Sequence, residues 1–164
     1  MNYSLNHSLN NILTISLNKP IHRRAFLAFA ASVVAGPAFA TPQAMKAAID
    51  AFTGGVAPTV GKVRLDVSQL VDNGNAVPIT VLVDSPMSAA DHVTMIALFN
   101  ERNPQTDIAR FTLGPRSGKA QVSTRIRMAT SQKLVAVARM SDGSFWSGSA
   151  DVLVTLAACI EGEA

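Results

Sequence analysis

The sequence has little of the chemistry on which most active sites depend. It has one cysteine, Cys159, and of its three histidines only His92 lies beyond residue 40. No His or Cys residues are paired at the spacing of a metal site, and neither a GxGxxG nor a GxSxG motif is present. These absences exclude most zinc enzymes, dinucleotide-dependent enzymes and α/β-hydrolases. The sequence predicts no metal, no cofactor and no catalytic residue.

A long hydrophobic run is also missing. The most apolar N-terminal stretch, Ala25 to Val34, is too short to cross a membrane. It follows a pair of arginines, and the segment matches the RRxFL core of the twin-arginine export signal through Arg23, Arg24, Phe26 and Leu27. An amphipathic surface helix with two chance arginines is the alternative.

The apolar stretch ends in a pattern that signal peptidase cuts. Residues 36–40 read Gly-Pro-Ala-Phe-Ala, with small side chains at Ala38 and Ala40. We therefore expect residues 1–40 to be a twin-arginine signal peptide. The mature protein is then expected in the periplasm, without stable membrane insertion.

The excess of positive charge belongs to this N-terminal segment. The chain has 14 Lys and Arg residues against 11 Asp and Glu, and three of the basic residues but none of the acids precede residue 41. The mature chain is therefore formally neutral. Nothing in its charge indicates a nucleic acid or an anionic membrane as a partner.

Beyond residue 40 the pattern predicts a helix followed by strands. Residues 43–52 are rich in alanine and are followed by Gly54-Gly55, which is typical of a short helix with a glycine stop. Apolar residues then alternate with polar ones, the period of a half-buried strand. The predicted strands are residues 62–67, 77–84, 91–99, 107–113, 120–128 and 133–140, and a last strand after a hairpin at Asp142-Gly143.

About seven short strands with no helix between them favour an all-β fold. We expect residues 41–156 to form an immunoglobulin-like antiparallel β-sandwich preceded by a short helix. Asp72-Asn-Gly-Asn75 predicts a turn, because Gly74 and its neighbours tolerate positive φ. Arg125 and Arg127 make the outward face of their strand basic. Trp146 is interpreted as a core anchor, with a ligand platform as the alternative.

The last fourteen residues place the cysteine near the C-terminus. Val152, Val154 and Leu156 alternate with other residues, so even positions face the core and Cys159 falls on the outward face. Beyond Leu156 the alternation ends. We expect residues 157–164 to form a C-terminal arm that carries the thiol, reaching about 10 Å from Leu156 to Cys159. A buried structural cysteine is the alternative.

A cysteine without a partner in an exported protein indicates intermolecular pairing or a reactive thiol. A nucleophilic dyad of Cys159 with His92 is the one catalytic arrangement that the residues leave open. Because a thiol on a chain end is poorly held for catalysis, we interpret His92 as an ordinary residue at the start of a strand.

Several motifs together resemble the SoxY family, the sulfur-carrier subunits of thiosulfate oxidation. The resemblance covers essentially the whole mature chain and ends in the cysteine. It rests on the order of Asp72-Asn-Gly-Asn-Ala-Val-Pro78, Val83-Asp-Ser-Pro-Met87, Phe99-Asn-Glu-Arg-Asn-Pro104, Ser123-Thr-Arg-Ile-Arg127 and Met140-Ser-Asp-Gly-Ser-Phe-Trp146.

The resemblance implies a function for the cysteine and a set of partners. It implies an immunoglobulin-like sandwich that forms a heterodimer with SoxZ and carries sulfur intermediates covalently on Cys159. Other proteins act on this cargo: a haem cytochrome pair couples thiosulfate to the thiol, a hydrolase releases sulfate, and in some organisms a sulfur dehydrogenase oxidises the remaining sulfane. The carrier itself is expected not to be an enzyme.

The arm departs from the family pattern. The usual ending is Gly-Gly-Cys-Gly-Gly, whereas this chain has Ala157 and Ala158 before the cysteine and Ile160 after it. Alanine restricts φ where glycine does not, so the arm is expected to be stiffer and bulkier. Glu161 and Glu163 add negative charge near the thiol, which disfavours the thiolate until a partner deprotonates it.

Two other functions compete with the carrier. One is a non-covalent periplasmic binding module in which the free cysteine is incidental, and the other is a small thiol-dependent enzyme. Sulfur-containing adducts on Cys159 would distinguish the carrier from the module.

Overall fold

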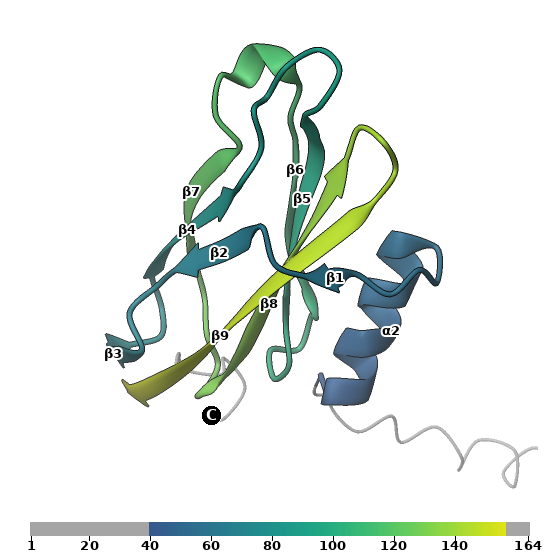
Figure 1. Cartoon of the computed structure of the whole chain (residues 1–164). Helices are drawn as coiled ribbons and strands as arrows, with labels where there is room; N and C mark the ends of the chain where they lie inside the picture. The colour runs from purple at the N-terminus through teal and green to yellow at the C-terminus, as the bar shows by residue number, and fades with distance from the viewer. Residues whose placement is uncertain (1–39, 157–164) are drawn as a thin grey trace, which may run out of the picture. The chain divides into compact units, whose positions relative to one another are not determined.

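The computed structural model describes residues 40–156, with side chains up to Thr155 (Figure 1). In this range the chain forms one α-helix, one short 3₁₀ helix and nine strands. In chain order they are α2 (Pro42–Thr53), β1 (Thr59–Val60), β2 (Val63–Asp66), β3 (Leu70–Asn73), β4 (Val77–Val83), β5 (Val93–Asn100), β6 (Asp107–Thr112), η1 (Pro115–Ser117), β7 (Gln121–Ile126), β8 (Gln132–Met140) and β9 (Phe145–Leu156).

The strands form an immunoglobulin-like β-sandwich, which confirms the predicted fold class. One sheet has the order β6-β5-β8-β9, with β1 and β3 both paired to the free edge of β9, and the other has the order β2-β4-β7. The core between the sheets comes from alternating residues, as the sequence predicted. On β4, for example, Val77, Ile79, Val81 and Val83 are buried and the residues between them are not.

The predicted helix over residues 43–52 is present and is one residue longer at each end. Thr41 caps it by accepting a hydrogen bond of 3.1 Å from the backbone N–H of Ala44, and Gly54 ends it with φ of 68°. Its apolar side packs on the outer face of the larger sheet through Met45, against Phe99 and others. Because β5 is covered by the core on one face and by α2 on the other, residues 96–100 are buried without interruption.

The hairpin and the tryptophan agree with the sequence interpretation. Gly143 has φ of 85°, and its N–H donates to the carbonyl of Met140. Hydrogen bonds from Ser144 lower the pKa of the Asp142 carboxyl. Trp146 is half-buried and packs against the main core, with Lys62 Nζ 4.7 Å from its ring centroid.

Two strands were not predicted, and both pair in parallel with β9. β1 has two residues and β3 has four, too short for a visible alternation. The predicted turn at residues 72–75 exists, but it joins β3 to β4 in the other sheet and none of its residues has positive φ. Instead the Asn73 side chain accepts a hydrogen bond of 2.9 Å from the N–H of Asn75.

The chain changes sheets between β1 and β2. Gly61, with φ of 131°, and Lys62, with φ of 56°, turn the backbone from the edge of β9 to the edge of β4. The turn brings β2 across β9 at Gly148, where an added Cβ would overlap the carbonyl oxygen of Val63. After β2 the chain returns to β9 as β3.

Candidate functional site

The last strand extends past the sheet that holds it. Gln132, the first residue of β8, pairs with Val152 of β9. The four residues from Leu153 to Leu156 therefore have no β8 backbone beside them. This overhang precedes the predicted arm, so its attachment determines where the arm begins.

On one side, the overhang pairs with β3. Leu70 is opposite Leu153, Val71 is opposite Val154 and Asn73 is opposite Leu156 (Figure 1). The N–H of Leu153 donates to the carbonyl of Gln69 at 2.8 Å. The Thr155 hydroxyl donates to the carbonyl of Asp72 at 3.1 Å, so a side chain reinforces the short ladder.

On the other side, a serine stands where β8 would continue. The Ser131 hydroxyl accepts a hydrogen bond of 2.9 Å from the N–H of Val154 and lies 3.5 Å from the carbonyl oxygen of the same residue, to which it donates. We call Ser131 and β3 together the arm clamp. It attaches the strand at both edges up to the last residues before the predicted arm.

The loops beside the arm clamp are held together by two amide side chains. Asn103 Oδ1 accepts from the N–H of Ala129 and from Nε2 of Gln132, and its Nδ2 donates to the carbonyl of Arg127. Gln132 Oε1 in turn accepts from the N–H of Arg102. Every buried side-chain N or O atom in residues 40–155 has a hydrogen-bond partner. The loop that presents Ser131 is therefore itself fixed.

The outward position of Cys159 is predicted from the alternation of buried and exposed residues along the last strand. That alternation is confirmed for residues 152–154. Val152 is buried and Val154 half-buried, whereas Leu153 is 62% exposed and its partner Leu70 is 59% exposed. The predicted site residues themselves lie outside residues 40–156: Cys159, Ala157, Ala158 and Ile160 of the arm, and Arg23, Arg24, Phe26 and Leu27 of the export signal.

His92 lies at the other end of the sheet from the arm clamp. Its ring Nδ1 is 3.1 Å from the carbonyl oxygen of Ser88, and its own carbonyl accepts from the N–H of Ser141, just past the end of β8. The eight steps of β8 from Met140 back to Gln132 span roughly 26 Å at about 3.3 Å per residue. Three residues of extended chain, the number from Leu156 to Cys159, span about 10 Å, and this length argues against the alternative of a Cys159–His92 dyad within one chain.

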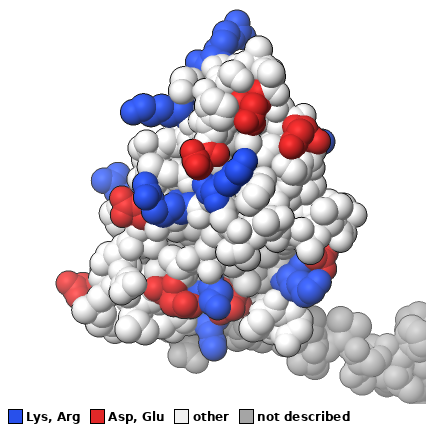
Figure 2. Space-filling view, viewed as in Figure 1, with Lys and Arg blue, Asp and Glu red and all other residues white. Residues whose placement is uncertain are grey.

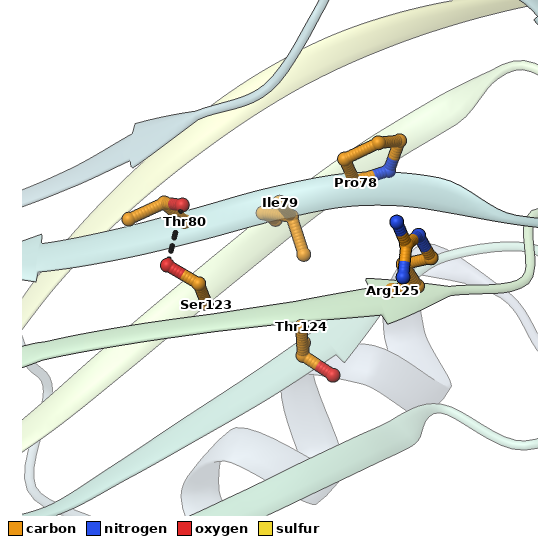
Figure 3. A pocket seen from close by; sticks show the side chains of 6 residues that line it. All are labelled: Pro78, Ile79, Thr80, Ser123, Thr124 and Arg125. Atoms are coloured by element: carbon orange, nitrogen blue, oxygen red, sulfur yellow. Dashed lines mark hydrogen bonds between the residues drawn. The ribbon is translucent and has the colours of Figure 1, made fainter.

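The rest of the described surface has a depression but no cluster of metal-ligating side chains and no helix that could span a membrane. In residues 40–156, no group of three or more His, Cys, Asp or Glu residues is placed to hold a metal ion, and no helix is long and apolar enough to cross a membrane. Figure 3 shows a surface depression over β4 and β7, where Thr80 and Ser123 hydroxyls lie 2.8 Å apart. Its one ionisable lining residue is Arg125.

Figure 2 shows basic and acidic side chains mixed on one face of the molecule. Some charged side chains form ion pairs, such as Arg110 with Asp107 and Lys133 with Asp151, the latter at 3.9 Å. Arg125 and Arg127 are exposed, as expected for the outward face of their strand.

Comparison with known families assigns the chain. The model of the family described as sulfur oxidation protein SoxY matches residues 49–159, which is more than half of the chain and includes the cysteine. The chain belongs to the SoxY family. No curated protein sequence matches it.

Solved structures agree with the family assignment, and some of them show the same fold in proteins of another family. The sulfur carrier protein SoxY from Chlorobium limicola f. thiosulfatophilum is 28% identical, with a TM-score of 0.57 over 66% of this chain and 89% of that chain. A superoxide reductase from Ignicoccus hospitalis has a TM-score of 0.52 at 17% identity, over 70% of this chain and 94% of that one. The second likeness shows the fold alone.

Neither side of the arm clamp was foreseen from the SoxY-like motifs. β3 is too short to show a period, and Ser131 is a single polar residue in a loop. Their role depends on β9, which follows them in the chain by more than ten residues, so no local signal identifies them.

Proposed function

We propose that this SoxY-family protein is a periplasmic carrier that holds sulfur intermediates of thiosulfate oxidation covalently on Cys159. The observation that supports this most is the position of the last anchored residue. The arm clamp holds β9 to Leu156, and the family match continues to the cysteine three residues later. A thiol about 10 Å beyond a fixed point suits presentation to a second protein.

The chemistry of the proposed cycle needs only a thiol from this chain. The Cys159 thiol loses its proton and forms an S–S bond with the sulfane sulfur of thiosulfate, and two electrons pass to the haem cytochrome pair. A hydrolase then adds water, releases sulfate and leaves a persulfide on Cys159. A sulfur dehydrogenase oxidises that sulfane in organisms that have one. The distance of His92 from the arm clamp supports a carrier over a thiol-dependent enzyme.

The arm residues bear on which partners accept the carrier. Ala157, Ala158 and Ile160 replace the glycines usual in the family. A stiffer and bulkier arm narrows the set of clefts that it enters. We propose that the partners of this chain have arm-binding clefts wide enough for Ile160.

We also propose SoxZ as the heterodimer partner and the twin-arginine route as the means of export. β6 and β7 are each paired on one edge only, and an open strand edge is a common site of association. Co-expression with SoxZ from the same source should give a 1:1 complex on size exclusion. A chain that elutes as a monomer in the presence of SoxZ contradicts the partner assignment.

Intact mass spectrometry of the protein purified from its own periplasm tests the carrier function. The expected result is a set of masses raised by sulfane and thiosulfonate groups, removed by reductant and mapped to Cys159. A uniformly unmodified thiol, in cells that are oxidising thiosulfate, would favour the non-covalent binding module instead.

A further inference from the structure

The hydroxyl of Ser131 replaces a missing strand at one residue. In a β-strand the N–H and C=O of a residue point to the same edge, and successive residues alternate between edges. Leu153 donates toward β3, so the polar groups of Val154 point to the other edge, where β8 has already ended. The Ser131 hydroxyl, as both acceptor and donor, serves both of them.

The opposite edge of the overhang is held by a short ladder and by packing against the core. β3 has four residues and pairs with residues 153–156 at the edge of the larger sheet, and Val71 and Val154 also pack against the main core. Ser131 and β3 therefore both contribute to the attachment of residues 153–156.

We infer that Ser131 is a positioning residue for the reaction of Cys159: it fixes the point at which the arm leaves the domain and so sets the length of the tether that delivers the thiol. This inference rests on the proposed carrier function. Ser131 does not act on sulfur. Its loop is held in turn by the hydrogen bonds of Asn103 and Gln132, which give the tether a rigid origin.

The tether length gives the expected size of the effect. With the arm clamp closed, three residues separate Leu156 from Cys159, and with it open the last fixed residue is Val152, seven residues away. The effective concentration of a tethered group falls as about the −3/2 power of tether length. For a tether that already spans the distance to the partner's site, complete opening of the arm clamp should therefore lower the rate of delivery about three- to fourfold, and partial opening should lower it by less.

The test compares Ser131→Ala with Ser131→Thr in the complex with SoxZ. The substrate is thiosulfate, the enzyme is the haem cytochrome pair from the same source, and kcat/KM for the carrier is measured from cytochrome reduction. Alkylation of Cys159 by iodoacetamide, followed by intact mass, measures the thiol without any enzyme. Ser149→Ala on β9 is the matched control, because that serine is exposed and its hydroxyl makes no hydrogen bond within residues 40–156.

The expected result is a kcat/KM lowered for Ser131→Ala by at most about three- to fourfold, an unchanged alkylation rate, and recovery with Ser131→Thr, which keeps the hydroxyl. Hydrogen exchange at the Val154 amide should be faster in Ser131→Ala than in the natural chain. It should be unchanged in Ser131→Thr. Thr155→Val removes the hydrogen bond to the Asp72 carbonyl on the β3 side, and it should also lower kcat/KM.

An unchanged kcat/KM in Ser131→Ala, or an equal loss in enzymatic and alkylation rates, overturns the inference. If the alanine variant does not fold, Thr155→Val decides by the same two measurements. The proposed function fails separately, when a chain without the Cys159 thiol still supports thiosulfate oxidation.

Discussion

The carbonyl oxygen of Val63 occupies the space that a side chain on Gly148 would need. Val63 belongs to the smaller sheet and Gly148 to β9 of the larger one, so the two sheets touch backbone to backbone at this point. The contact lies where the chain, having changed sheets at Gly61 and Lys62, crosses over β9. This contact fixes β2 against β9, between β1 and β3, the two short strands that pair with the edge of β9.

Gly148→Ala should therefore destabilise the domain. The Cβ would meet a backbone carbonyl, which cannot rotate away as a side chain can, and overpacking of this kind costs about 1–3 kcal/mol. Urea unfolding should show the loss as a lower midpoint with an unchanged slope. Gly114→Ala is the control, since nothing lies within 4 Å of its added Cβ, and its effect should stay within about 0.5 kcal/mol. Equal stability of the two variants would mean that β2 can move away from β9 freely.

Cys159→Ser should abolish thiosulfate-dependent turnover of the reconstituted system. Oxygen is close to sulfur in size, but a hydroxyl cannot accept and release sulfane cargo reversibly. Unfolding free energy should change by no more than about 0.5 kcal/mol, and SoxZ should still bind, if the side chain lies outside the core. Turnover that persists in the serine variant, with no second carrier present, would remove the attachment site and the function assigned to it.

Proline in the arm should slow the use of the Cys159 thiol by partner enzymes without changing the intrinsic reactivity of the thiol. Ala157→Pro and Ala158→Pro restrict the backbone ahead of the cysteine without touching the thiol. We expect the rate of iodoacetamide alkylation to be kept and use by the partner enzymes to be slowed. Glycine at the same positions is the matched control, and it should match or exceed the natural arm. Proline variants that work at the full rate would show that arm conformation is unimportant.

The export signal makes a separate prediction. Replacing Arg23 and Arg24 by lysine should stop export, because the twin-arginine route requires the arginine pair, and the precursor should accumulate in the cytoplasm. The protein isolated from the periplasm should begin at Thr41, after cleavage at Ala40. N-terminal sequencing and cell fractionation measure both results. A mature protein that still carries residues 25–40 would contradict the predicted cleavage.

Much of the domain could be predicted because the signals lie within a few residues of each other. The alternation on β4 from Val77 to Val83 selects one buried face, and Gly54 ends α2 in the left-handed conformation that glycine favours. The Asp142-Gly143 hairpin is equally local. The motifs that resemble SoxY were also visible in the sequence, and the family match confirmed them.

The sequence by itself determined the period of the strands, the helix and its glycine stop, and the family to which the chain belongs. Tertiary structure alone decided that β1 and β3 pair in parallel with β9, that Gly148 must lack a side chain, and that Ser131 completes the edge beside Val154. The physical reason is distance along the chain. Periodicity and capping involve neighbours, whereas a backbone N–H at Val154 finds its partner in whichever remote segment the folded sheets bring to it.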